Sequence, residues 1–189
     1  MQVLPTTDFL QNADWTFPVP IAYGPGRFDE LPEHCQRLNL KNPLIVTDRG
    51  TVSLTFVSGA TDLLAQAGIA STIFHNISQN PTESDVRNAL FAFRSGSHDG
   101  VIAIGGGSGM DAGKTTALLA GSRHELWAHD YEKVPPKLDT TDKFPPLICV
   151  PTTSGTGAET ESTAMITHLD RGMKLCVWHP LLKPQLAIL

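Results

Sequence analysis

The chain has 189 residues, of which 41% are hydrophobic and 17% charged, and its 19 acidic and 14 basic side chains give a net charge of -5. This composition allows a packed core but gives no basic surface of the kind that binds phosphate backbones, so no nucleic-acid partner is expected. No apolar run approaches the roughly 20 residues of a membrane-spanning helix, so no membrane partner is expected either.

The first residues and the cysteines indicate where the protein works. The N-terminal sequence MQVLPTTDFL has neither the positive start nor the apolar stretch of a secretory leader. Cys35, Cys149 and Cys176 are odd in number and far apart, which suits neither a disulfide framework nor a zinc knuckle. We therefore expect a cytoplasmic protein, and the length suggests one domain.

The middle of the chain begins with a strand, a helix and a second strand. The β-branched run at 44–47 is bounded by turn residues and predicts a buried strand. Apolar residues at helical spacing over 53–67 predict a helix that ends at Gly68. The run at 71–77 predicts the next strand.

A second helix, a third strand and a third helix follow. Thr82, with Asp85 three residues later, predicts the start of a helix that runs to Gly96. The sequence GVIAIGGG at 100–107 predicts a strand that ends in glycines, and a helix is expected over 108–119. This alternation predicts an α/β fold with a Rossmann-like parallel sheet and flanking helices.

The last third of the chain breaks this alternation. The polar, proline-containing segment 122–146 predicts a surface excursion, and 147–151 predicts another buried strand. The stretches 162–168 and 173–178, joined by a turn, predict a C-terminal β-hairpin. The final residues, QLAIL, predict one more buried strand.

The glycine-rich segment 104–115 (IGGGSGMDAGKT) is the densest candidate site. Glycines at the carboxyl end of a strand permit a tight turn and the close approach of a ligand. The following helix offers free N–H groups and a positive dipole end, which suit a phosphate. We expect Ser108 to cap this helix and donate to the phosphate, and Asp111 to lie in its first turn. A purely structural turn is the alternative.

Two standard phosphate motifs fit this segment incompletely. The residues GKT at 113–115 match the end of a P-loop, but Ser108 occupies the position of its first glycine. The dinucleotide motif GxGxxG fails from Gly105 because position 110 is methionine, and from Gly107 it fits only in the weaker form GxGxxA. A P-loop-type phosphotransferase is therefore an alternative only.

Two other predicted strand ends also carry polar residues. The loop PTTSGTGAE at 151–159 supplies hydroxyl donors for sugar and phosphate oxygens. At the end of the first strand, the carboxylate of Asp48 can accept hydrogen bonds from a ribose and repel a 2′-phosphate, although it can equally cap a turn. Because ligands of open α/β sheets bind at the carboxyl ends of strands, the three segments predict one cleft.

Five segments in a fixed order carry a family resemblance. They are TD at 47–48, NPT at 80–82, GGGSGMDAGK at 105–114, PTTSGTGAE at 151–159, and a lysine at 174. In this combination the chain resembles the iron-containing (group III) alcohol dehydrogenases over about residues 23–189. The resemblance implies an NAD(P)-dependent alcohol dehydrogenase or aldehyde reductase.

The resemblance also implies cofactor-binding roles for individual residues. Asp48 would meet the adenosine ribose and favour NAD over NADP, Asn80 would line the cleft, Asp111 would lie near the cofactor and Lys114 would be mostly structural. Gly105, Gly106, Gly107 and Ser108 would lie at the pyrophosphate, and Thr152, Thr153 and Thr156 around the adenine and ribose. Lys174 would lie near the nicotinamide ribose, and a solvated surface lysine is the alternative for this residue.

The metal ligands of the family have no match in this chain. By resemblance, an aspartate and three histidines of a helical domain that would begin just after Leu189 hold a divalent iron or zinc. The seven histidines here are scattered and form neither HxxxH nor HExxH. We therefore assign no metal ligand and no catalytic residue to this chain.

The favoured hypothesis is that residues 1–189 form the dinucleotide-binding domain of a two-domain, metal-dependent alcohol dehydrogenase. Such an enzyme passes hydride between a small alcohol or aldehyde and the nicotinamide, and we expect it to be a homo-oligomer. The 189-residue chain alone is expected to be inactive because it would supply only the dinucleotide site. A stand-alone NAD-binding module without catalysis is the alternative.

Overall fold

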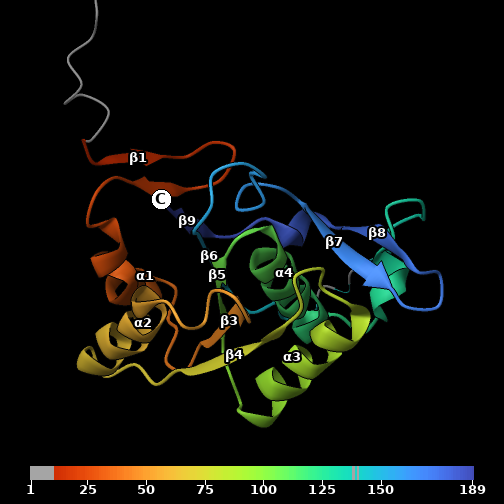
Figure 1. Ribbon diagram of the computed structural model, residues 1–189, viewed down its shortest axis with the longest axis horizontal. Coiled ribbons are helices and arrows are strands. Elements are labelled where there is room, and N and C mark those ends of the chain that lie inside the picture. Colours follow the sequence, from red (N-terminus) through yellow and green to blue (C-terminus); the bar gives the residue numbers. More distant parts are fainter. Residues whose placement is uncertain (1–10, 138, 140) are drawn as a thin grey trace, which may run out of the picture.

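A parallel sheet with helices on both faces forms the body of the molecule (Figure 1). The structure is a computed structural model that describes residues 11–137, 139 and 141–189. The expectation about a leader rests on residues 1–10 and lies outside the described residues. The helices are α1 (Leu31–Arg37), α2 (Thr55–Gln66), α3 (Glu83–Ser95) and α4 (Gly107–Gly121).

Within the described part of the chain the main sheet has seven strands in the order β1-β2-β9-β6-β5-β3-β4. In chain order they are β1 (Ala13–Trp15), β2 (Ile21–Tyr23), β3 (Leu44–Asp48), β4 (Thr72–Ile77), β5 (Val101–Gly105), β6 (Leu147–Pro151) and β9 (Leu186–Ile188). All neighbours pair in parallel except β1 and β2, which are antiparallel. The predicted α/β class and its parallel sheet are therefore confirmed.

The central strands are continuously apolar because both faces of the sheet are covered. Ile45 of β3 packs in a core cluster with residues of α1 and α2, whereas its neighbours Leu44 and Val46 pack with residues of α3 and α4. Figure 1 shows the two helix pairs on opposite sides of the sheet. No helix among the described residues is long and apolar enough to cross a membrane.

The predicted start of α3 is confirmed by its capping box. Thr82 Oγ1 accepts a hydrogen bond from the Asp85 backbone N–H (3.1 Å), and Asp85 Oδ2 accepts one from the Thr82 N–H (2.9 Å). This reciprocal pair satisfies two donors that the first turn of a helix leaves free. The same Asp85 oxygen lies 3.3 Å from the N–H of Ser78, which ties the end of β4 to the helix.

The predicted hairpin is also confirmed, as β7 (Thr163–His168) and β8 (Met173–Trp178), an antiparallel pair separate from the main sheet. Its inward-facing side chains, such as Ile166 and Val177, pack on α4 through Leu118. The last predicted strand is β9, which lies between β6 and β2. The strands β1 and β2 and the helix α1 had no sequence prediction, because Pro18, Pro20 and Pro25 lie between these elements and Pro32 lies within α1.

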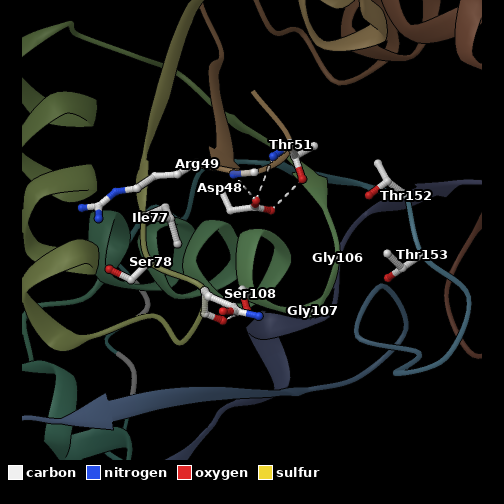
Figure 2. Close-up of a pocket in the computed structure, with 12 residues that line it drawn as sticks. Asp48, Arg49, Thr51, Ile77, Ser78, Gly106, Gly107, Ser108, Thr152 and Thr153 are labelled. Atoms are coloured by element: carbon white, nitrogen blue, oxygen red, sulfur yellow. Dashed lines mark hydrogen bonds between the residues drawn. The ribbon is translucent and has the colours of Figure 1, made fainter. Parts of the chain in front are cut away.

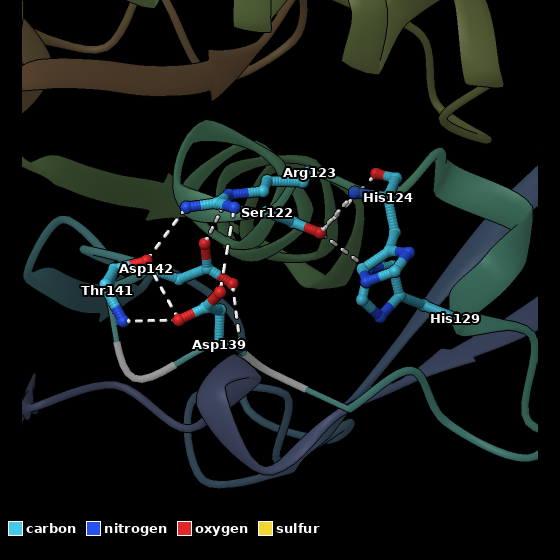
Figure 3. A network of polar contacts seen from close by, with 7 residues as sticks. All are labelled: Ser122, Arg123, His124, His129, Asp139, Thr141 and Asp142. Atoms are coloured by element: carbon cyan, nitrogen blue, oxygen red, sulfur yellow. Dashed lines mark hydrogen bonds and ion pairs between the residues drawn. The ribbon is translucent and has the colours of Figure 1, made fainter.

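The prediction of a surface excursion over 122–146 is wrong for its first half. Leu126, His129 and Asp130 are buried, and Asp130 forms an isolated bridge with Val177 of β8. Figure 3 shows that the Ser122 hydroxyl lies against the His129 ring, with 3.2 Å between Oγ and Nε2. Apolar residues hidden in a polar stretch bind this segment to the hairpin.

The same figure shows a second anchor of the segment. Arg123 Nε pairs with Asp142 (2.9 Å), and its Nη1 lies 3.7 Å from Asp139 (Figure 3). These two ion pairs join the beginning and the end of the 122–146 segment.

Candidate functional site

A cavity of about 680 Å³ lies at the carboxyl ends of β3, β5 and β6. Because β5 pairs with both β3 and β6, residues that follow the three strands meet at one sheet edge. Figure 2 shows them around the cavity. Its lining includes Asp48, Arg49, Gly106, Gly107, Ser108, Thr152 and Thr153.

Asp48 organises the turn that follows β3. Its Oδ1 accepts hydrogen bonds from the backbone N–H groups of Gly50 and Thr51, both at 2.9 Å, and its Oδ2 accepts one from Thr51 Oγ1 at 2.8 Å (Figure 2). A carboxylate has about four lone-pair sites, so Oδ2 keeps capacity for a further donor. Asp48 therefore caps the turn, as the alternative interpretation expected, and also forms part of the cavity wall.

The glycine turn after β5 is closely packed. Gly105 has φ +147°, and a Cβ there would lie 3.0 Å from Asp48 Oδ2. A Cβ on Gly106 would lie 3.2 Å from Thr153 Oγ1. The turn thus presents bare backbone to the cavity and fills the space between the other two strand ends.

The amino end of α4 faces this cavity, but two details differ from expectation. Gly106, not Ser108, is the N-cap, and Ser108 Oγ donates to the carbonyl of Gln79. Asp111 lies in the second turn of the helix, because α4 begins at Gly107. The N-cap makes no side-chain hydrogen bond, so the first N–H groups of α4 are available to an anion.

A second cavity of about 320 Å³ adjoins the first and shares Gly107 and Ser108 with it. Asp111, Thr156, Glu161 and Lys174 are among its lining residues. The two cavities flank the amino end of α4. An elongated ligand with phosphates at its centre could therefore place one end in each cavity.

Burial changes the acidity of Asp111 in the second cavity. Its pKa is raised, mainly because burial disfavours the charged carboxylate. A hydrogen bond from the Met165 backbone N–H to Oδ2 (3.0 Å) and the charges of Lys114 and Lys174 act in the opposite direction.

The structure brings most of the predicted site residues together. The first cavity collects Asp48, Gly106, Gly107, Ser108, Thr152 and Thr153, and the second adds Asp111, Thr156 and Lys174. Gly105 lies beneath the turn and lines neither cavity. Asn80 is exposed and also lines neither, although its neighbours Gln79 and Pro81 line the first and the second.

Arg49, Gln79 and Glu161 line the cavities without having been predicted to do so. The first two adjoin predicted residues, and that adjacency was the available signal. Glu161 follows the PTTSGTGAE loop, and nothing in its local sequence distinguishes it from a surface carboxylate.

The P-loop alternative is wrong for this chain. A P-loop lysine must reach a phosphate, whereas Lys114 is 0% exposed. Its Nζ donates to the carbonyl oxygens of Ala158 (2.7 Å) and Thr163 (2.6 Å).

Within the described residues, no group of three or more His, Cys, Asp or Glu side chains is placed to hold a metal ion. The nearest approach of histidines is that of His129 to His179, with ring centroids 5.5 Å apart. His179 Nδ1 is already the acceptor for the Leu181 backbone N–H.

Comparison with known proteins places this architecture in a family. The family model described as iron-containing alcohol dehydrogenase matches residues 18–189. The chain is 40% identical over 161 residues to 4-hydroxybutyrate dehydrogenase of Cupriavidus necator, a match that covers 84% of this chain and 41% of that protein.

Two solved structures show the same fold. A 1,3-propanediol oxidoreductase is 28% identical, with a TM-score of 0.80, and the match covers 95% of this chain and 45% of that one. The sulfoacetaldehyde reductase from Bifidobacterium kashiwanohense, solved in complex with NAD⁺, is 29% identical with a TM-score of 0.76, covering 94% and 45%.

The chain thus spans about two fifths of the length of the curated relatives it matches. The match begins close to the point at which the motif order first resembled the family, and it continues to Leu189. The chain belongs to the iron-containing alcohol dehydrogenase family.

Proposed function

We propose that residues 1–189 form the dinucleotide-binding domain of an alcohol dehydrogenase or aldehyde reductase. The observation that carries this proposal is the meeting of Asp48, the glycine turn and the threonine loop at the amino end of α4. The relatives named as dehydrogenases and reductases support the reaction class. In the whole protein, the bound dinucleotide would accept hydride from an alcohol or donate it to an aldehyde.

The proposed site divides the dinucleotide between the two cavities. The pyrophosphate would lie on Gly106, Gly107 and Ser108, where free N–H groups and the helix dipole favour an anion. The adenosine half would occupy the first cavity beside Asp48, Thr152 and Thr153, with Gly105 shaping the turn beneath it and Gln79, rather than its exposed neighbour Asn80, in the cavity wall. The nicotinamide half would occupy the second, beside Asp111 and Lys174. Thr156, which was expected around the adenine and ribose, lines this second cavity and would lie on the nicotinamide side instead.

The carboxylate of Asp48 supports NAD over NADP as the cofactor. A ribose hydroxyl can donate to Oδ2, whereas a 2′-phosphate would meet a like charge. Arg49 also lines this cavity, but its Nε is held by Asn76 Oδ1 at 2.9 Å, and Figure 2 shows its side chain leading away from the threonines.

The family description names iron, and the residues described here do not fit such an ion. For the whole protein we propose a divalent iron or zinc ion and a small alcohol or aldehyde substrate. We also propose that it is a homo-oligomer located in the cytoplasm.

Titration of the 189-residue chain with NADH, followed by nicotinamide fluorescence, tests the site. We expect saturable binding that Gly106→Val abolishes, because its side chain would strike Thr153 and cover the helix N-terminus. Gly59→Ala in α2, with open space around it, is the control and should bind as the wild type does. Failure of the wild-type chain to bind either NADH or NADPH would reject the proposal.

A further inference from the structure

Lys114 is a fully buried lysine in the third turn of α4, away from both cavities. Taking an ammonium group out of water is costly, and burial accordingly lowers the pKa of Lys114. Such a side chain is retained in a core only where it makes strong hydrogen bonds. Its two acceptors therefore indicate its role.

Both acceptors are backbone carbonyls that bracket one short segment. Ala158 O (2.7 Å) lies at the end of the threonine loop, and Thr163 O (2.6 Å) lies at the first residue of β7. Among the hydrogen bonds of the described residues, the one to Ala158 is the only bond that joins 153–161 to a residue outside that segment. Lys114 is thus the polar anchor of this part of the loop.

Asp111, one helical turn before Lys114, completes the anchor. Its Oδ2 accepts the Met165 backbone N–H at 3.0 Å, two residues after the carbonyl that Lys114 binds. Residues i and i+3 share a helix face, so α4 holds a donor and an acceptor against successive backbone groups of β7. The two opposite charges also stabilise each other.

The anchored segment is part of the cavity walls. Thr153 lines the first cavity, and Thr156, Ala158 and Glu161 line the second. We propose that Lys114 is a positioning residue that sets cofactor affinity by fixing residues 153–161, without touching the cofactor. This inference rests on the proposed dinucleotide site.

The test compares Lys114→Met with Leu64→Ala in the purified 189-residue chain. Methionine keeps the length and apolar stem of lysine but leaves both carbonyls without a donor. Leu64 is buried in α2 on the other face of the sheet, so its truncation destabilises the core without reaching the loop. Far-UV and near-UV circular dichroism define a temperature at which both variants are folded.

Two readouts separate positioning from general stability. We expect Lys114→Met to weaken NADH binding at least tenfold and to speed amide hydrogen exchange across 153–161, with exchange at 48–51 unchanged. Leu64→Ala should bind NADH within twofold of the wild type. Wild-type affinity and loop exchange in folded Lys114→Met, or an equal loss of affinity in Leu64→Ala, would overturn the proposal.

Lys114→Gln decides the matter if the methionine variant does not fold. Glutamine keeps N–H donors but is too short to reach both carbonyls, so we expect the same changes at smaller size, and wild-type behaviour would overturn the proposal. If the wild-type chain binds no dinucleotide, the proposed function fails. Loop exchange in the variants, measured without cofactor, still tests the anchoring.

Discussion

Asp48 Oδ2 occupies the space into which a side chain on Gly105 would project, because a Cβ on Gly105 would lie 3.0 Å from that oxygen. The two residues end neighbouring parallel strands, β3 and β5. Asp48, which we propose binds the ribose, and the glycine turn, which we propose binds the pyrophosphate, therefore pack as one unit. A substitution in either should alter the position of the other.

Gly105→Ala should destabilise the fold and weaken NADH binding. The residue has φ +147°, which L side chains rarely adopt, and the added Cβ would press on Asp48. We expect a loss of about 1–3 kcal/mol in the free energy of unfolding, measured by urea denaturation. Gly59 lies in helix α2, and a Cβ added there would have nothing within 4 Å. Gly59→Ala should therefore raise the free energy of unfolding by about 0.5–1 kcal/mol. Equal effects of the two changes would contradict this account of the turn.

Asp48→Asn should shift cofactor choice towards NADP. Asparagine keeps an oxygen for the Gly50 and Thr51 N–H groups, so the turn should survive while the negative charge is lost. We expect NADPH affinity to rise about tenfold, or about 1.4 kcal/mol, and NADH affinity to fall severalfold. Asp48→Gly should change the ratio in the same direction but also loosen the turn. An unchanged ratio of the two dissociation constants would show that Asp48 only caps the turn.

Acidification should destabilise the protein through His129. Burial, with the charges of the facing His179 and His124 as smaller causes, lowers the pKa of His129 from 6.5 to about 4. Between these two pH values the unfolded chain binds more protons than the folded one, so stability falls as the pH falls, by up to about 3 kcal/mol.

Urea denaturation at about pH 7 and about pH 4.5 measures this slope. His129→Gln should flatten it, because glutamine does not titrate, whereas His75→Gln on an exposed part of β4 should leave it unchanged. A steep slope that persists in His129→Gln would place the acid-sensitive group elsewhere.

Thr82→Ala should cost about 1 kcal/mol in the free energy of unfolding, because it removes the hydroxyl of the α3 capping box. Thr61→Ala is the matched control, since Thr61 is a half-buried residue of α2 whose hydroxyl bonds to Ser58 O within the same helix. Thermal unfolding of both variants checks the difference. A control that loses as much as Thr82→Ala would show that the cap contributes nothing specific.

The strands β3, β5 and β6 and the start of α3 were predictable because their determinants are local. A continuous apolar run between turn residues specifies a strand buried on both faces, and Thr82 and Asp85 are close enough in sequence to form their capping box unaided. The glycine turn and the threonine loop could likewise be placed at one edge of the sheet, since parallel strands end on the same side. The pairing of β2 with β9, near opposite ends of the chain, had no such local determinant.

The sequence by itself determined the fold class and the family, because the order of the motifs and the pattern of apolar strands can be read directly from the linear sequence. Only the tertiary structure decided where individual side chains point. Ser108 resembles a helix cap in sequence, yet its hydroxyl bonds to Gln79, because Gly106 already occupies the cap position. In the P-loop reading of GKT, Lys114 would be a phosphate ligand, yet it is turned into the core, where it donates to the carbonyls of Ala158 and Thr163. A hydrogen-bond partner distant in sequence exists only once the chain has folded, and such partners decide the role of each polar residue at this site.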